Sequence, residues 1–159
     1  MYEKTNVMRI LDQKKIKHKT YSYVGTGAIS GIEVAEVLGQ NPKYVFKTLV
    51  TVGKSKNNYV FVIPVEKELD LKKAAKAVGE KSIDMIKSKE LLPLTGYIHG
   101  GCSPIGMKKL FKTVIDITAQ DFDTIIFSAG KIGYQVEVSL SDLTKVVPYD
   151  LNDIADVEI

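Results

Sequence analysis

One stretch of thirteen residues, YIHGGCSPIGMKK at positions 97 to 109, gathers most of the groups in this chain that could do chemistry. It holds the only cysteine, Cys102, one of only two histidines, His99, and three of the twelve glycines. A histidine and a cysteine at this spacing could form half of a metal site, or a nucleophile with its base. The glycines could instead bring backbone N–H groups close to a ligand.

The metal interpretation fails on the number of ligands. A structural zinc ion takes four ligands, mostly cysteine or histidine, and the only other histidine is His18. We therefore predict neither a metal nor another cofactor. If a strand continues from Tyr97, its alternation directs Ile98 and His99 to opposite faces, so His99 is a poor base for Cys102. A lone cysteine is more often a small packed residue, and a nucleophilic Cys102 stays open as the less favoured alternative.

The backbone interpretation rests on Gly100, Gly101 and Pro104. Adjacent glycines can adopt positive φ angles and allow a ligand to approach, and the proline stiffens the loop. Successive free N–H groups in such a turn form a small anion site, suited to a carbonyl oxygen that gains negative charge. The alternative is a plain tight turn between two strands, and the residues alone leave it open.

A second candidate is Lys47, in the middle of the apolar segment VFKTLVTV. In a strand its side chain shares a face with Val45 and Leu49. Burying an ammonium group is costly unless it meets an anion or several acceptors, which favours a binding role. An edge strand with Lys47 facing water is the alternative.

The elements around these candidates alternate between helices and strands. The sequence predicts a hairpin of strands at 45–52 and 59–65, and a second hairpin at 124–130 and 134–139. Helices are predicted after the N-capping residues Thr5, Ser30 and Asp70. This order predicts the α+β class, a mixed α/β arrangement in which helices surround a mixed sheet curled toward a barrel.

The composition places few further limits on function. A chain of 159 residues with 45% hydrophobic and 26% charged residues predicts one soluble domain spanning residues 1–159. The net charge of +3 permits an anionic partner without requiring one. The first fifteen residues carry charges throughout, unlike a signal peptide, and no apolar run approaches a membrane span of about 18 to 20 residues. We therefore expect a cytoplasmic protein without a membrane partner.

Four separated motifs, KTLV, VIPVEKELDLKKAAKAVG, TGYIHGGCSPIGMKK and FSAGKIGYQVEV, occur in an order and spacing that resemble the YbaK family. These are free-standing bacterial editing proteins related to the editing domain inserted in bacterial prolyl-tRNA synthetases. The resemblance covers about residues 5–143. It implies a curled, barrel-like α/β fold and the deacylation of mischarged aminoacyl-tRNA, chiefly cysteinyl-tRNA(Pro).

The resemblance also implies which residues form the site. Lys47 matches the motif lysine, and Gly100 and Pro104 match the glycine–proline loop. The implied catalytic residues are Lys47, Gly100 and Gly101, and the implied substrate-binding residues are Tyr23, Ser103, Pro104, Ser128 and Gln135. One departure concerns Gln135, which stands where a well-known relative has aspartate. Because glutamine cannot act as a base or carry charge, we expect Gln135 to be at most a hydrogen-bonding wall residue.

In the family that this chain resembles, the thiol of the substrate cysteine attacks its own ester carbonyl. The products are a cyclic thioester and free tRNA. The protein would then contribute positioning and stabilisation of the oxyanion. The implied partners are tRNA(Pro) and prolyl-tRNA synthetase, and cysteinyl-tRNA(Cys) is a further possible substrate. The alternatives are a deacylase of alanyl-tRNA(Pro) and a catalytically silent module that binds tRNA or a synthetase.

Overall fold

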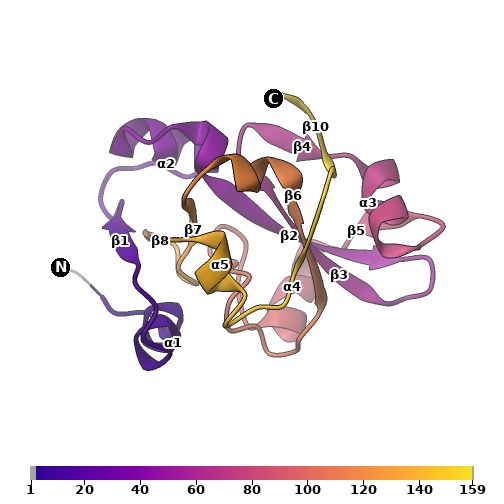
Figure 1. Ribbon diagram of the computed structural model, residues 1–159, viewed down its shortest axis with the longest axis horizontal. Helices are drawn as coiled ribbons and strands as arrows, with labels where there is room; N and C mark the ends of the chain where they lie inside the picture. The colour runs from indigo at the N-terminus through magenta and orange to yellow at the C-terminus, as the bar shows by residue number, and fades with distance from the viewer. Residues whose placement is uncertain (1–2, 159) are drawn as a thin grey trace.

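The computed structural model describes residues 3–158, and its largest sheet has the strand order β5-β2-β3-β6-β9 (Figure 1). These strands are β2 (Phe46–Gly53), β3 (Asn58–Pro64), β5 (Ile83–Met85), β6 (Lys112–Asp116) and β9 (Asp150–Asn152). β2 and β3 form the predicted antiparallel hairpin. β6 runs parallel to both β3 and β9, so the sheet is mixed.

A smaller antiparallel sheet lies beside the start of β2. It consists of β1 (Lys19–Ser22), β8 (Tyr134–Val138) and β7 (Ile125–Ser128), in that order. A parallel bridge between Val45 and Ile126 joins the two sheets. A separate pair is formed by β4 (Lys67–Leu69) and β10 (Ala155–Glu158). The α+β class is confirmed, but the described strands form separate sheets and do not close into a barrel.

Three helices begin directly after the predicted capping residues Thr5, Ser30 and Asp70. The described helices are α1 (Asn6–Gln13), α2 (Gly31–Leu38), α3 (Leu71–Val78), α4 (Ser88–Thr95) and α5 (Leu140–Leu143), with 3-10 turns at Pro42–Tyr44 and Ile117–Asp121. At α2 the Ser30 hydroxyl accepts the Glu33 N–H, and the Glu33 carboxylate accepts the Ser30 N–H at 2.9 Å. Gly39 ends this helix with a left-handed φ of 67°.

Both faces of the β2–β3 hairpin are covered. Phe46, Val50 and residues of the smaller sheet such as Phe127 belong to the largest apolar cluster. Phe61 on the opposite face packs in a cluster that includes Ala74 of α3. β2 also has strands on both sides, with β3 along one side and β5 and the bridge to β7 on the other. The start of β2 is therefore not a free edge.

Within residues 3–158, none of the helices combines the length and the apolar character that a membrane crossing needs.

Candidate functional site

A cleft of about 510 Å³ opens where the two sheets meet. The start of α2, the start of β2, α4, the ends of β7 and β8 and the loop at 99–102 all contribute to its wall. Five of the eight residues predicted for the site line it, namely Tyr23, Lys47, Gly100, Ser128 and Gln135. The fold therefore brings together residues that are up to 112 positions apart in the sequence.

The other three predicted residues do not line the cleft. Gly101 is buried, and a Cβ added there would lie 3.1 Å from the backbone nitrogen of Ile132. Ser103 is fully buried, and its hydroxyl accepts the Ile105 N–H at 3.3 Å. Pro104 lines a second, smaller pocket of about 290 Å³. The structure thus places these residues where they support the loop.

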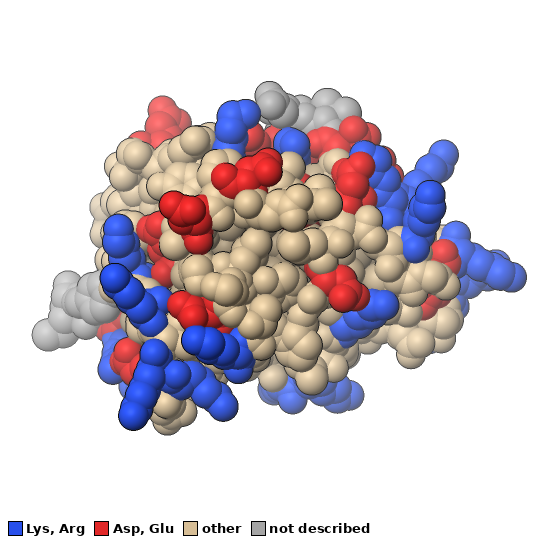
Figure 2. All heavy atoms as spheres, viewed as in Figure 1, with Lys and Arg blue, Asp and Glu red and all other residues tan. Residues whose placement is uncertain are grey.

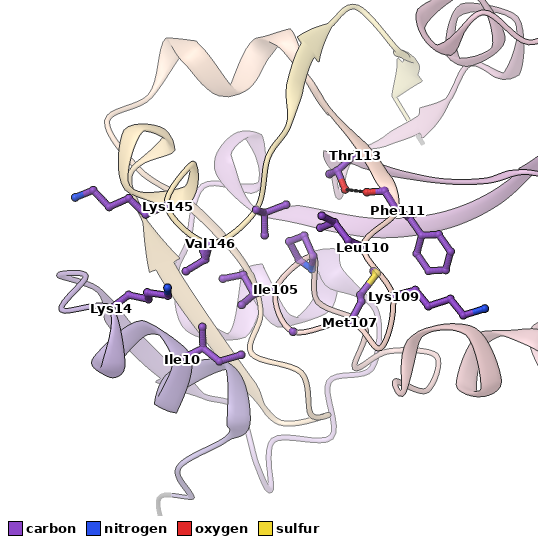
Figure 3. Close-up of a pocket in the computed structure, with 13 residues that line it drawn as sticks. Ile10, Lys14, Ile105, Met107, Lys109, Leu110, Phe111, Thr113, Lys145 and Val146 are labelled. Atoms are coloured by element: carbon purple, nitrogen blue, oxygen red, sulfur yellow. Dashed lines mark hydrogen bonds between the residues drawn. The ribbon is translucent and has the colours of Figure 1, made fainter.

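The second pocket lies between the glycine loop, α1 and the segment that follows α5 (Figure 3). Its wall is mainly apolar, with Ile105 and Leu110 among its residues. Lys109 and Lys145 extend away from the pocket in Figure 3, and Lys145 forms an ion pair with Asp142 at 2.8 Å. The loop at 99–106 therefore separates the cleft from this pocket.

Lys47 contributes a half-buried ammonium group to the cleft wall. It pairs with Ile63 in the β2–β3 ladder. Burial lowers the pKa of Lys47 from its usual value of 10.5, and the charge of Glu68 partly opposes that shift. Among residues 3–158, no hydrogen bond or ion pair holds this ammonium. The site therefore contains a partly dehydrated positive charge that a ligand could neutralise.

The loop at 99–102 has free backbone N–H groups, although one of them belongs to a different residue than predicted. Residues 98–101 form a turn in which the Gly101 N–H donates to the Ile98 carbonyl at 3.0 Å. Gly100 has a φ of 86°, which this turn position requires and which favours glycine. Within the described chain, the N–H groups of Gly100 and Cys102 have no acceptor. These two N–H groups, rather than that of Gly101, are the candidate oxyanion donors.

The Cys102 thiol lines the cleft but is poorly suited to act as a nucleophile. Burial raises its pKa to about 12, against a small opposing effect of a hydrogen bond with Thr95. At neutral pH the group is therefore a protonated thiol, which is a weak nucleophile.

His99 was set aside as a base on the assumption that a strand continues from Tyr97. That assumption is wrong, because His99 stands in the turn at 98–101, is exposed and lines the cleft. His18 lies outside the cleft wall, and its Nδ1 is 2.8 Å from the Ile16 carbonyl oxygen.

The cleft wall contains no aspartate or glutamate among the residues that the structure describes. Within the same residues, no three histidine, cysteine, aspartate or glutamate side chains are grouped closely enough to hold a metal ion. The arrangement can stabilise negative charge and donate hydrogen bonds, but it offers no carboxylate base.

Two polar side chains complete the wall at the ends of β7 and β8. The Ser128 hydroxyl oxygen accepts the Gly130 N–H at 3.1 Å, which leaves its own proton available to the cleft. The Gln135 side-chain oxygen accepts an N–H of Gln40 at 2.8 Å. Sequence reasoning missed Gln40, because nothing local marks the residue after Gly39 as a neighbour of β8.

Comparison with known proteins identifies relatives by sequence and a solved structure with the same fold. The chain is 49% identical over 138 residues to EbsC of Enterococcus faecalis, whose name describes a proposed Cys-tRNA(Pro)/Cys-tRNA(Cys) deacylase. The match covers 86% of this chain and 84% of that protein. The chain is also 30% identical over 105 residues to the proline–tRNA ligase of Thermodesulfovibrio yellowstonii, covering 66% of this chain and 18% of the ligase.

A crystal structure described as a proposed trans-editing enzyme for prolyl-tRNA synthetase has the same fold. Its TM-score is 0.81 at 21% identity, and the superposition covers 95% of both chains. Residues 28–146 match the aminoacyl-tRNA editing domain, a range that includes Lys47, the glycine loop and Gln135. The chain therefore belongs to the family of aminoacyl-tRNA editing domains.

Proposed function

We propose that this protein is a trans-editing deacylase that releases cysteine from mischarged cysteinyl-tRNA(Pro). The observation that carries the proposal is the cleft, which combines Lys47 and the free N–H groups of Gly100 and Cys102 with no carboxylate base. The relationship to EbsC supports this substrate, and activity on cysteinyl-tRNA(Cys) is part of the same proposal.

The substrate is an ester between an amino acid and a ribose hydroxyl of the terminal adenosine. Attack on the ester places negative charge on the carbonyl oxygen, which the N–H groups of Gly100 and Cys102 stabilise. Fixed donors of this kind are worth about 3–4 kcal/mol each in known enzymes. Lys47 holds the substrate by its charge or by hydrogen bonds, while Tyr23 and Ser128 form the surrounding wall.

The nucleophile in this proposal comes from the substrate. The cysteinyl sulfur, after losing its proton to solvent, bonds to the carbonyl carbon and closes a four-membered cyclic thioester. The bond between that carbon and the ribose oxygen breaks, and the oxygen takes up a proton. The described cleft wall has no carboxylate, and its buried Cys102 is protonated, which supports a reaction in which the substrate supplies the nucleophile.

Selection of tRNA(Pro) is assigned in this proposal to prolyl-tRNA synthetase, acting with this protein in a shared complex in the cytoplasm. The partial similarity to a proline–tRNA ligase supports that link. Figure 2 shows lysine and arginine side chains gathered over α1 at one end of the molecule and over α3 at the other. Such groups suit contact with the phosphate backbone of tRNA.

A deacylation panel tests the proposal directly. Cysteinyl-, alanyl- and seryl-tRNA(Pro) and cysteinyl-tRNA(Cys) are incubated with the protein, and release of free tRNA is followed. We expect cysteinyl-tRNA(Pro) to be cleaved well above the spontaneous rate. Faster cleavage of alanyl-tRNA(Pro) would assign the alanine-specific activity instead, and binding of tRNA without release would identify a silent binding module.

A further inference from the structure

Two buried side-chain oxygen atoms lack a hydrogen-bond partner within the part of the chain that the structure describes. One is the hydroxyl of Thr48, a residue of the cleft wall, and the other is the side-chain oxygen of Gln40. Since most buried polar atoms in folded proteins are paired, each exception calls for an explanation. The nitrogen of the same Gln40 amide does have a partner, because it donates to the Gln135 side-chain oxygen.

The hydrogen bond between the two amides has a direction. Gln40 donates and the Gln135 oxygen accepts, at 2.8 Å. Gln135 is only 5% exposed and lines the cleft, whereas Gln40 does not line it. Because the Gln135 oxygen is turned toward Gln40, its NH₂ group is the end left for other partners, and no described residue accepts from it.

The position of Gln135 in the sheet brings this NH₂ group close to the other donors. Gln135 stands opposite Ser128 in the β7–β8 ladder, so the two side chains share a face. Both line the cleft together with Lys47 and the loop at 99–102. Within the described residues, the cleft thus presents hydrogen-bond donors from several elements and no carboxylate to accept from a cationic ligand.

We infer that Gln40 is a positioning residue that fixes Gln135 as a hydrogen-bond donor to an uncharged oxygen acceptor of the aminoacyl-adenosine end. That acceptor is an ester or ribose oxygen of the substrate, so the inference rests on the proposed function. Without Gln40, the Gln135 amide can rotate by half a turn about its last bond. Its oxygen would then face the substrate oxygen, and two acceptors would meet without a proton between them.

Three substitutions at Gln40 test whether the direction of its hydrogen bond to Gln135 matters, or only the space that its side chain fills. Gln40→Lys keeps a donor toward the Gln135 oxygen, Gln40→Met removes it at similar size, and Gln40→Glu replaces it with an acceptor that favours the rotated amide. We expect KM for cysteinyl-tRNA(Pro) within about threefold of wild type for Gln40→Lys. It should rise about tenfold for Gln40→Met and further for Gln40→Glu, with kcat changing less.

Gln135→Met supplies the matched control. In that background the three Gln40 substitutions should have no further effect on KM, because the amide that they orient is gone. A purely structural role of Gln40 would instead lower the melting temperature in parallel with activity, whether or not Gln135 is present. Equal KM values across the series, or a Gln40→Glu variant more active than Gln40→Lys, would overturn the inference.

A binding measurement distinguishes failure of this inference from failure of the proposed function. The probe is the amide analogue of 3′-cysteinyladenosine, which cannot be cleaved as an ester, and its Kd is measured by calorimetry. We expect the same order of variants in Kd as in KM. If wild type releases no tRNA but binds the analogue in this order, the proposed function fails and the inference stands. If wild type does not bind the analogue, the inference fails as well.

Discussion

At the scale of single residues, Lys47 is a charged group whose partial burial in the fold is unfavourable. Its ammonium is half-buried in a strand with apolar clusters on both faces, and Glu68 offsets the loss of hydration only in part. A residue placed in this way contributes little to stability, so a role in binding a ligand better accounts for a charge at this position.

We expect Lys47→Met to lose most deacylase activity while its free energy of unfolding stays equal to or above that of wild type. The folded pKa of Lys47 lies below 10.5, so the folded state binds the proton less tightly than the unfolded chain does. The resulting destabilisation is complete below the folded pKa and disappears as pH rises toward 10.5. Urea unfolding of both proteins across this range should therefore show their stabilities converging as pH rises.

For Cys102 we expect, in contrast to Lys47, that substitution leaves most of the activity. Cysteine is a reactive residue type, but burial keeps this thiol unreactive. With a pKa of about 12, roughly one thiol in ten thousand is ionised at about pH 8. Iodoacetamide should therefore leave the folded protein almost unlabelled and react readily after denaturation. Cys102→Ala should keep deacylation within several-fold of wild type. Rapid labelling together with an inactive alanine variant would show that the thiol takes part in the reaction.

At the scale of elements, the start of α2 forms part of the cleft wall and packs tightly against the end of the β2–β3 hairpin. A Cβ at Gly31 would lie 2.4 Å from a methyl carbon of Val65. Both residues line the cleft, so a change in their contact should alter the width of the cleft. Glycine at the first position of this helix is thus a requirement of packing, and the Ser30 cap fixes where the helix begins.

Gly31→Ala should push the start of α2 away from Val65 and raise KM for aminoacyl-tRNA, with a smaller loss of stability. Val65→Ala removes the methyl carbon that would lie 2.4 Å from the new Cβ and leaves the Cβ of residue 65 at 2.9 Å. The double variant should therefore have a KM closer to that of wild type than Gly31→Ala alone. Steady-state kinetics of the four proteins give the coupling, and strictly additive effects would mean that the contact does not shape the cleft.

Sequence patterns predicted the local elements well for a physical reason. A cap such as Ser30 or Asp70 acts within three residues of itself, so the sequence contains all the information needed to place it. The His99 turn was missed because the glycines that create it were assumed to follow a strand. The orientation of Gln135 was also not predictable, since its partner Gln40 is 95 positions away in the sequence.

At the scale of the whole molecule, the arrangement of the sheets was the part that the sequence described least well. The parallel pairing of β6 with β3 joins residues about fifty positions apart, and no local pattern selects it over other pairings. Closure into a barrel depends on register across many strands, and in the described chain the two larger sheets are linked by the bridge between Val45 and Ile126. The cleft lies at this junction, which explains why its wall draws on so many separate segments.

Substrate preference is a property of the whole site together with its substrate. Serine and cysteine differ by one atom, a change that binding alone discriminates by only about 10- to 200-fold. If the substrate thiol attacks, seryl-tRNA(Pro) should be cleaved far more slowly than cysteinyl-tRNA(Pro), even at equal affinity. The rate on the cysteinyl ester should also rise with pH as the substrate thiol, with a reference pKa near 8.5, ionises.

Since His99 lines the cleft, the pH profile must also be measured in a His18→Ala, His99→Ala double variant. We expect the rise with pH to persist in that variant. Its disappearance, or similar rates on serine and cysteine esters, would show that the protein or a bound water supplies the attack.

The cleft wall without a carboxylate also bears on how such an enzyme would be found in a cell extract. Activity-based probes for hydrolases are electrophiles that label a serine activated by a base or an ionised cysteine. In this cleft no described residue accepts a hydrogen bond from the Ser128 hydroxyl, and the thiol of Cys102 is protonated. Surveys with fluorophosphonate or haloacetamide probes should therefore overlook this protein. Affinity capture on an immobilised adenosine amide should recover it.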